Sequence, residues 1–433
     1  MRCKQLTEWL SWLESLHPTE IDLGLTRIQQ VFTQLNPAKL GKWVITVAGT
    51  NGKGSTIAML QAILQQAGYR VGVYTSPHFL HYNERVVIEG QPVSDSQLIE
   101  AFHAVDLARK ETSLTYFEFG TLAAFWLFQQ QPLDVVLLEV GLGGRLDAVN
   151  IIDPDIAVVT SIGLDHESFL GNDLNTIAWE KTGIARPDAP LIYGDETLYP
   201  SVIQRAEAEQ FQLLVKGKDF IAEQQANTWV FKGKTNIDRA GKVVDCEIPG
   251  LPYPSLPFTN ALTVLQTLQQ LPLSIPYEAI VNGLMSARLL GRLQVEQVRI
   301  KGKPVRLILD VAHNPAAAEM IAQRLQQTYQ ARRAVFAVLA DKDVEGIVAA
   351  MTPVIDHWYI SQVDAERALS VEALKAVFAG QAIENVQPFK QVRLAIEQAV
   401  KEAEPNEEII VLGSFYTVAE TLAFIPCWVE EQK

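Results

Sequence analysis

Short apolar runs alternate along most of this chain with segments in which apolar residues recur every three or four positions. The runs are typical of buried strands, and the spaced pattern is typical of amphipathic helices. Their alternation predicts βαβ units and a mostly parallel sheet, which is an α/β fold. The predicted strands are 43–48, 70–74, 134–140, 155–160, 190–193, 306–309, 334–339, 357–360 and 408–412. The predicted helices are 55–67, 96–110, 120–130, 174–185, 315–329 and 417–424.

One region departs from this alternation. Between residues 211 and 248 the helical period fades, and the pairs Lys232-Gly233 and Gly241-Lys242 are typical of turns. The pattern predicts an antiparallel addition to the fold.

A proline-rich stretch at 249–257 leads into a helix from Phe258, and the strand and helix patterns restart at about Gln294. The remaining chain has the length of an ordinary domain. We therefore expect a larger domain over 1–290 and a smaller, Rossmann-like α/β domain over 291–433.

Composition and charge limit the classes of partner. The chain has 433 residues, of which 48% are hydrophobic and 20% charged, as in ordinary globular proteins. Its 36 basic and 50 acidic residues give a net charge of −14, which repels nucleic acid and anionic membranes. The three cysteines are widely separated, and neither a signal peptide nor a stretch long enough to span a bilayer is visible. We expect a soluble, cytoplasmic protein with no nucleic-acid or membrane partner.

The strongest local signal is the segment GTNGKGST at 49–56, which follows a predicted strand and precedes a helix. Phosphate binding needs glycines that let backbone N–H groups turn inward, a lysine for the β and γ oxygens and a hydroxyl near Mg²⁺. The residues that supply these groups are Thr50, Asn51, Gly52, Lys53, Gly54, Ser55 and Thr56. Gly54 separates Lys53 from Ser55, where the common pattern has lysine directly before the hydroxyl residue. The alternative is a plain glycine-rich turn with a solvated Lys53.

Acidic and histidine residues follow the next predicted strands. Glu139 ends one strand before a glycine loop that contains Arg145, and His166 follows another strand. The carboxyl ends of parallel strands are where α/β sheets bind ligands, so Glu139 and His166 are candidate Mg²⁺ ligands. Alternatively, Glu139 pairs with Arg145, and His166 caps a helix.

Lys181 lies on the predicted helix that follows His166. If it faces the same pocket, burial would depress its pKa, and a neutral amine can react with CO₂ to form an anionic carbamate. The alternative from the sequence alone is an ordinary surface charge.

Motifs over nearly the whole chain carry a family resemblance. They are GTNGKGS at 49–55, TSPH at 75–78, YFEFGTLAA at 116–124, EVGLGGRLDAVN at 139–150, LDHESFLG at 164–171, AWEKTGI at 178–184, LLGRLQ at 289–294, DVAHNP at 310–315, ADKD at 340–343 and VLGSFYTVAE at 411–420. Together they resemble the folylpolyglutamate synthase/dihydrofolate synthase family of the Mur ligase superfamily. Val311 and Thr182 stand where the family commonly has glycine and alanine, and neither is a proposed reacting group.

The resemblance implies a P-loop ATPase domain over 1–290 that carries the pterin site, and a glutamate-ligase domain over 291–433. It implies an ATP- and Mg²⁺-dependent ligase of folate and one-carbon metabolism that adds L-glutamate to dihydropteroate and to tetrahydrofolates. Carboxylates and amines do not condense spontaneously in water, so ATP would first phosphorylate the carboxylate, a step that needs positioning and charge neutralisation. The expected assembly is a monomer that acts on small molecules.

The resemblance also assigns roles to single residues. The implied metal ligands are Ser76, Glu139, His166 and a carbamylated Lys181, beside the loop hydroxyl of Ser55. The remaining ATP contacts are Asn260, Arg292, Asp310 and His313, with Arg292 offering a fork of donors to phosphate. The implied catalytic residues are Lys53, Lys181, His166 and Arg292.

The substrate segments are implied in the same way. The pterin pocket would comprise Leu23, Gly24, Leu25, Thr115, Tyr116, Phe117, Glu118, Arg145, Leu146, Asp147 and Ala148. Without the resemblance, Phe117 would be assigned to the core. Ser414 is either a simple helix cap or a contact for glutamate, and Asn314 with Pro315 is typical of a helix start.

Three rival functions remain open. A folylpolyglutamate synthase without the dihydrofolate activity shares these motifs. A cell-wall Mur ligase usually carries an extra N-terminal domain, for which the 48 residues before the loop leave too little chain. A P-loop switch or kinase would not need the second α/β domain with its Asp310 and His313 motif.

Overall fold

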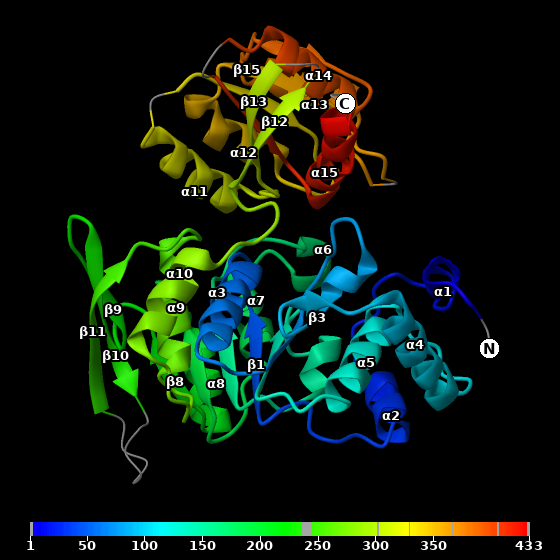
Figure 1. Ribbon diagram of the computed structural model, residues 1–433, viewed down its shortest axis with the longest axis vertical. Coiled ribbons are helices and arrows are strands. Elements are labelled where there is room, and N and C mark those ends of the chain that lie inside the picture. The colour runs from blue at the N-terminus through cyan, green and yellow to red at the C-terminus, as the bar shows by residue number, and fades with distance from the viewer. Residues whose placement is uncertain are drawn as a thin grey trace. The chain divides into compact units, whose positions relative to one another are not determined.

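The computed structural model describes residues 3–235, 244–300, 303–328, 330–365, 367–404 and 407–430. The chain divides into two compact units, Met1–Arg288 and Leu289–Lys433 (Figure 1). The expected turn Gly241-Lys242 and the expected helix end at residue 329 lie outside the described residues.

The larger unit is built on a mostly parallel sheet. Its described strands are β1 (Trp43–Ala48), β2 (Val71–Tyr74), β3 (Val86–Ile88), β4 (Gln91–Pro92), β5 (Val135–Glu139), β6 (Ile156–Val159), β7 (Pro190–Tyr193) and β8 (Gln212–Val215), in the order β4-β3-β2-β5-β1-β6-β7-β8. The strands β2, β5, β1, β6, β7 and β8, which are neighbours in this order, run parallel. β3 pairs antiparallel with β2 at one edge of the sheet, and β4 pairs antiparallel with β3. Because β1 lies between β5 and β6, the loops that follow these three strands leave the same edge of the sheet.

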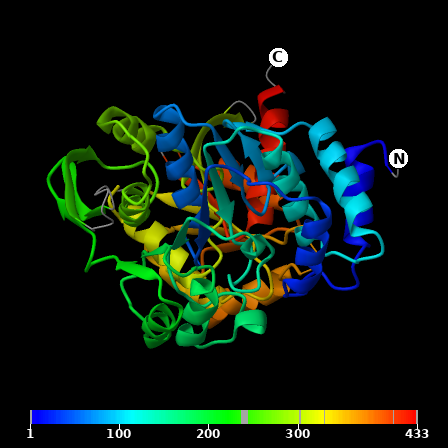
Figure 2. The same cartoon turned by 90° about the horizontal axis from the view of Figure 1, so that it is seen from below.

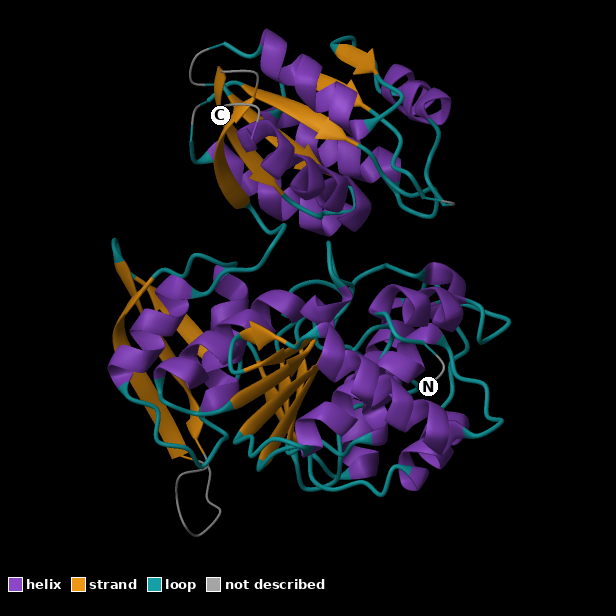
Figure 3. Ribbon diagram, turned by 45° about the vertical axis from the view of Figure 1, so that its right-hand side comes forward, coloured by secondary structure: helices purple, strands orange, loops and turns teal. Residues whose placement is uncertain are grey.

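Helices cover both faces of this sheet (Figure 3). They are α1 (Leu6–Glu14), α2 (Thr26–Gln34), α3 (Lys53–Gln66), η1 (Tyr82–Arg85), α4 (Asp95–Arg109), α5 (Tyr116–Gln129), η2 (Ala148–Ile151), α6 (Glu167–Leu170), α7 (Leu174–Thr182), α8 (Pro200–Glu209), α9 (Phe258–Leu268) and α10 (Tyr277–Ser286). Trp9 of α1 is buried against Phe102 of α4 and Phe119 of α5, and Figure 2 shows α1 alongside α4.

The start of α5 differs from the sequence prediction. The helix begins at Tyr116, four residues before the predicted start at 120. Thr115 and Glu118 form a capping box, in which each side chain bonds the other residue's backbone N–H. This cap overrides the weak helix propensity of the aromatic residues at 116 and 117.

An antiparallel sheet of β9 (Ile221–Gln224), β10 (Thr228–Thr235) and β11 (Val244–Pro252) confirms the predicted addition. The predicted turn at Lys232-Gly233 is wrong. Both residues lie inside β10, paired with Glu247 and Cys246 of β11. Alternate residues of β10, among them Trp229 and Phe231, are fully buried, so packing fixes this segment as a strand.

The smaller unit is also α/β. Its described strands are β12 (Gln294–Ile300), β13 (Lys303–Leu309), β14 (Arg332–Phe336), β15 (His357–Ile360), β16 (Val386–Pro388) and β17 (Glu408–Leu412), in the order β12-β13-β17-β14-β15-β16. Its described helices are α11 (Pro315–Gln326), α12 (Val344–Met351), η3 (Thr352–Val354), α13 (Val371–Gly380), α14 (Val392–Glu402) and α15 (Phe415–Glu430). β12 pairs antiparallel with β13, the other pairs are parallel, and Phe336, Trp358 and Phe378 pack together in the core.

The α/β class predicted from the sequence is confirmed. None of the helices in the described part of the chain combines the length and apolar character that crossing a membrane requires.

Candidate active site

The segment after β1 forms a tight loop that leads directly into α3. Gly49 has φ +144°, and a Cβ there would lie 1.9 Å from Oγ1 of Thr160, so only glycine fits. Gly52 has φ +89° and is the N-cap of α3. The loop residues therefore end at a helix N-terminus, whose free N–H groups and dipole favour phosphate.

The chain after β6 holds this loop in place. Ser161 accepts the N–H of Thr50 on its carbonyl oxygen at 2.8 Å and the N–H of Asn51 on its hydroxyl at 3.0 Å. Thr50 Oγ1 donates to the carbonyl oxygen of Gly163 at 3.0 Å. These bonds join the ends of two neighbouring strands, so the loop conformation is set before any ligand binds.

Lys53 and Asn260, two of the residues assigned to ATP, both lie at the loop. Nζ of Lys53 donates to the carbonyl oxygens of Gly49 and Thr50, at 2.9 and 3.3 Å. A Cβ on Gly52 would lie 2.7 Å from Oδ1 of Asn260, so α9 places this amide directly against the loop.

A hollow beside the loop brings several predicted residues together. It is lined by Gly49, Thr50, Lys53, Val140, Gly141, Leu142, Gly143, Asp165, His166 and Lys181. These residues follow β1, β5 and β6 or lie on α7, so segments far apart in the sequence meet at one edge of the sheet.

Lys181 is buried, with 5% of its surface exposed. Burial lowers its pKa to about 7, and the nearby charge of Lys53 acts in the same direction. The alternative of a surface lysine is therefore wrong. With this pKa, roughly half of the amine is neutral near pH 7, and the neutral form can act as a nucleophile.

Glu139 is buried at the end of β5 and accepts the backbone N–H of Ser76 on Oε2 at 3.2 Å. Two predicted metal ligands are thus adjacent. The alternative partner of Glu139, Arg145, pairs with Glu180 of α7 through Nε and Nη2, at 3.1 and 2.9 Å.

His166 lies at the N-cap position of α6, but its side chain makes no capping hydrogen bond. His166 thus caps α6 through its backbone carbonyl oxygen, which accepts the N–H groups of Phe169 and Leu170, and its imidazole takes no part in the cap. Within the described residues, no three His, Cys, Asp or Glu side chains form a metal cluster. The buried carboxylate of Glu139 is the kind of ligand that Mg²⁺ uses, together with oxygens from water and phosphates.

The predicted pterin segments flank the loop after β5. Phe117 is half-buried, and a Cβ on Gly141 would lie 2.7 Å from its ring, so the ring covers the loop rather than the centre of the core. Asp147 accepts the N–H groups of Leu142 and Val149, at 2.8 and 3.0 Å. Burial raises the pKa of Asp147 to about 6. Leu146 is half-buried and Ala148 is buried beside it.

The segment Leu23, Gly24 and Leu25 is half-buried before α2, and a Cβ on Gly24 would meet nothing within 4 Å. An open backbone of this kind leaves space for a ligand. Arg27, just inside α2, contacts Glu118 and is a residue that the sequence reasoning missed.

The smaller unit contains its own cluster. Asp310 follows β13 and accepts the N–H groups of Leu293 and Ala312, both at 2.8 Å, and Nη1 of Arg292 lies 3.9 Å from its Oδ1. Burial raises the pKa of Asp310. His313 and Arg292 both lie near the ring of Phe415, which also escaped the sequence reasoning.

In this unit α11 begins at Pro315, as predicted, whereas α15 begins at Phe415, two residues before the predicted start at 417. Asn314 accepts the N–H of Ala317 at 2.9 Å, with Pro315 in the first turn of α11. Ser414 accepts the N–H of Thr417 at 3.0 Å, so it caps α15, while a contact with glutamate stays a prediction.

Asp165 lines the hollow with Lys53, His166 and Lys181, and the sequence reasoning did not assign it. Its position directly before His166, in the segment that follows the predicted strand 155–160, was the available signal.

Comparison with known proteins defines the class. The Mur ligase middle domain matches residues 47–251, and the Mur ligase glutamate ligase domain matches residues 291–415. A protein of Escherichia coli named dihydrofolate synthase/folylpolyglutamate synthase is 41% identical over 422 residues, which cover 97% of this chain and 95% of that protein.

Two solved structures extend the match. Escherichia coli FolC in complex with DHPP and ADP has a TM-score of 0.90 at 40% identity, over 99% of both chains. A bifunctional folylpolyglutamate synthase/dihydrofolate synthase with Mn, AMPPNP and L-glutamate has a TM-score of 0.88 at 41% identity, over 98% of both chains. This chain belongs to the dihydrofolate synthase/folylpolyglutamate synthase family of Mur ligases, and it is accordingly a ligase.

Proposed function

We propose that this chain uses ATP to join L-glutamate to dihydropteroate, forming dihydrofolate, and to add glutamate to reduced folates. The observation that carries the proposal is the hollow in which Lys53 of the phosphate loop meets His166 and the buried, low-pKa Lys181. The relatives with both activities in their names support the same reaction.

The larger unit provides the phosphoryl-transfer groups. The N–H groups at the start of α3 and the ammonium of Lys53 bind and neutralise the ATP phosphates. The substrate carboxylate attacks the γ-phosphorus, ADP leaves, and an acyl phosphate forms. The glutamate amine then attacks the acyl carbon, and inorganic phosphate leaves.

Mg²⁺ fits the buried oxygen donor of Glu139. We assign its binding to Ser55, Ser76, Glu139, His166 and a carbamylated Lys181. Bound there, it would neutralise phosphate charge. The carbamate forms when Nζ of neutral Lys181 attacks CO₂, with formation of an N–C bond and release of one proton.

The remaining assignments follow the family. We assign Asn260, Arg292, Asp310 and His313 to ATP, and Ser414 to glutamate. The pterin pocket takes the segments around Leu23–Leu25, Thr115–Glu118 and Arg145–Ala148. We further propose a cytoplasmic monomer that acts on small molecules, in line with its net charge of −14, and size-exclusion chromatography with light scattering tests the assembly.

A direct assay tests the function. Dihydropteroate and tetrahydrofolate are each incubated with ATP, Mg²⁺ and L-glutamate, and ADP and the glutamylated product are measured. The proposal expects glutamate-dependent ADP release with both substrates. Reaction with tetrahydrofolate alone would leave a folylpolyglutamate synthase, and reaction with neither would refute the proposal.

A further inference from the structure

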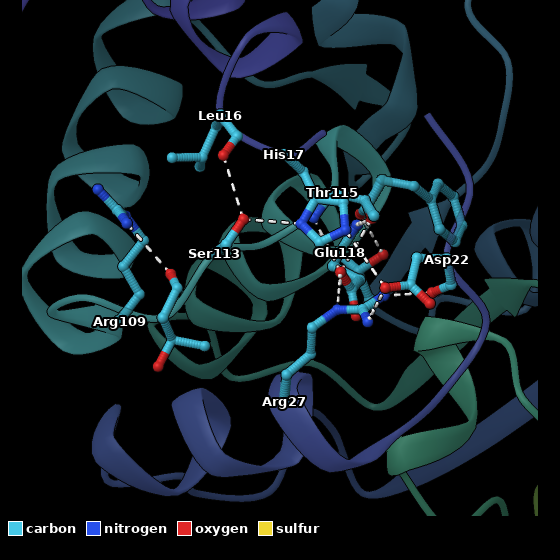
Figure 4. Close-up of polar contacts among 11 residues, drawn as sticks. Leu16, His17, Asp22, Arg27, Arg109, Ser113, Thr115 and Glu118 are labelled. Carbon is cyan, nitrogen blue, oxygen red and sulfur yellow. Dashed lines mark hydrogen bonds and ion pairs between the residues drawn. The ribbon is translucent and has the colours of Figure 1, made fainter. Parts of the chain in front are cut away.

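The guanidinium of Arg27 joins two segments that are distant in the sequence. Its Nε donates to Oε2 of Glu118 at 2.9 Å, and its two Nη atoms donate to Oδ2 and to the carbonyl oxygen of Asp22 (Figure 4). Asp22 directly precedes Leu23–Leu25, and Glu118 belongs to the first turn of α5. One side chain therefore ties together two of the three segments assigned to the pterin.

Glu118 depends on this contact for its charge balance. Its side chain is 5% exposed, and Oε2 also accepts the N–H and the hydroxyl of Thr115, at 2.8 and 3.0 Å. Its other oxygen, Oε1, is buried and has no hydrogen-bond partner among the described residues. A carboxylate buried in this way is costly unless a cation faces it, and Arg27 supplies that cation.

A second tether runs between the same segments. Nε2 of His17 lies 3.3 Å from Oδ2 of Asp22, and Nδ1 lies 2.7 Å from Oγ of Ser113, two residues before Thr115 (Figure 4). A neutral His17 that donates from Nε2 to Asp22 accepts the Ser113 hydroxyl on Nδ1, and Oγ of Ser113 also lies 3.1 Å from the carbonyl oxygen of Leu16. His17 and Arg27 thus both hold Asp22. Their contacts fix the position of the chain just before Gly24, whose backbone is open.

We propose that Arg27 is a positioning residue for the pterin pocket, which it shapes by fixing Leu23–Leu25 against the start of α5. The inference rests on the proposed function. Arg27 does not line the hollow around Lys53 and Lys181, so its loss should weaken binding of the pterin substrate without changing the phosphoryl-transfer groups.

The test compares Arg27→Gln with Arg70→Gln, which breaks the bidentate Arg70–Glu89 pair elsewhere in the same unit. Equilibrium binding of dihydropteroate and the steady-state constants are measured for each folded variant. For Arg27→Gln we expect Kd and KM for dihydropteroate to rise at least about tenfold, the scale of one charge-assisted hydrogen bond. KM for ATP and for glutamate, and kcat at saturating dihydropteroate, should change less than about twofold. Arg70→Gln should leave all of them at wild-type values.

The variant Arg27→Lys keeps the positive charge but removes the forked guanidinium, so it tests the two contributions separately. A lysine can face Glu118 but lacks the planar fork that also reaches Asp22, so recovery should be partial. Full recovery would overturn the positioning role, since charge alone would then suffice. If Arg27→Gln fails to fold, Asp22→Asn tests the same link, and we expect a smaller rise in the dihydropteroate Kd.

The outcomes separate this inference from the proposed function. A wild-type protein that does not bind dihydropteroate would overturn both. A wild-type protein that binds it, together with an unchanged Kd in Arg27→Gln, or in Asp22→Asn if that variant replaces it, would overturn the positioning role alone.

Discussion

Lys181 and Lys53 line one hollow, and burial together with the Lys53 charge lowers the pKa of Lys181 to about 7. The ammonium form of Lys181 would place a second cation there and repel Mg²⁺. The carbamate form replaces that cation with anionic oxygens. The lowered pKa makes this conversion accessible at neutral pH, because only the neutral amine reacts with CO₂.

The first prediction concerns the pH dependence of this conversion. Above a folded pKa of about 7 the amine is neutral, and below it the amine is protonated. At fixed dissolved CO₂, reactivation of CO₂-stripped enzyme should accelerate about tenfold from pH 6 to pH 8 and then level off. A rate that keeps rising tenfold per pH unit to pH 10 would be that of an ordinary lysine.

Substitution at the same position supplies the control. Lys181→Ala should fold but be nearly inactive, and small carboxylic acids should partly restore it by occupying the vacated space. Lys181→Glu should recover little, since its carboxylate is too short to reach the same place. Wild-type-like activity of Lys181→Ala would show that the reaction does not need a carbamate at this position.

Lys53 is predicted to neutralise charge in the phosphoryl-transfer transition state. Lys53→Ala should lower kcat at least about 10²-fold, the scale of one preorganised charge contact, with the fold intact by circular dichroism. Lys42→Ala, which removes an exposed lysine paired with Asp134, is the matched control and should keep normal kcat. Near-normal turnover in Lys53→Ala would contradict the phosphate-loop assignment.

Glu139 and His166 are predicted to hold Mg²⁺. Glu139→Gln and His166→Ala should each raise the Mg²⁺ concentration that gives half-maximal activity, since each removes one ligand. The readout is a metal titration at saturating ATP. Titration curves that match the wild type in both variants would return these residues to structural roles.

A stability prediction concerns the smaller unit. Glu408 pairs with Arg332 at 2.8 Å, and both side chains are nearly fully buried. Glu408→Ala should lower the free energy of unfolding by about 3–5 kcal/mol, because it leaves a buried cation unpaired. Amide hydrogen exchange in β17 reports the loss. Arg393→Ala, in a more exposed pair with Glu397, should cost less than about 1 kcal/mol, and equal losses would contradict this account.

Most of the fold could be predicted from the sequence, because the local pattern of apolar and β-branched residues agrees with the burial of the strands that they form. The run at 43–48 is both apolar and β-branched, and it forms β1 with the predicted bounds. Prediction failed where a side chain far from the segment decided its conformation. Gln266 on α9 accepts the N–H of Lys234 at 3.0 Å and helps to keep as a strand a segment that resembled a turn.

The site followed the same rule. Lys53 and Glu139 could be identified because the carboxyl ends of parallel strands meet at one edge. The burial of Lys181 could not be derived from its helix alone, since Gly144 packs against its backbone from a loop about forty residues earlier. Arg27 was missed because its partners, Asp22 and Glu118, meet only in the folded chain.

The central claim is that the substrate carboxylate is phosphorylated before glutamate attacks it. Dihydropteroate labelled with ¹⁸O in both carboxylate oxygens is incubated with ATP, Mg²⁺ and L-glutamate, and the inorganic phosphate is analysed by mass spectrometry. The account predicts one ¹⁸O atom in the phosphate for each dihydrofolate formed, since the acyl oxygen leaves with phosphorus. Dihydrofolate formed together with unlabelled phosphate would contradict it.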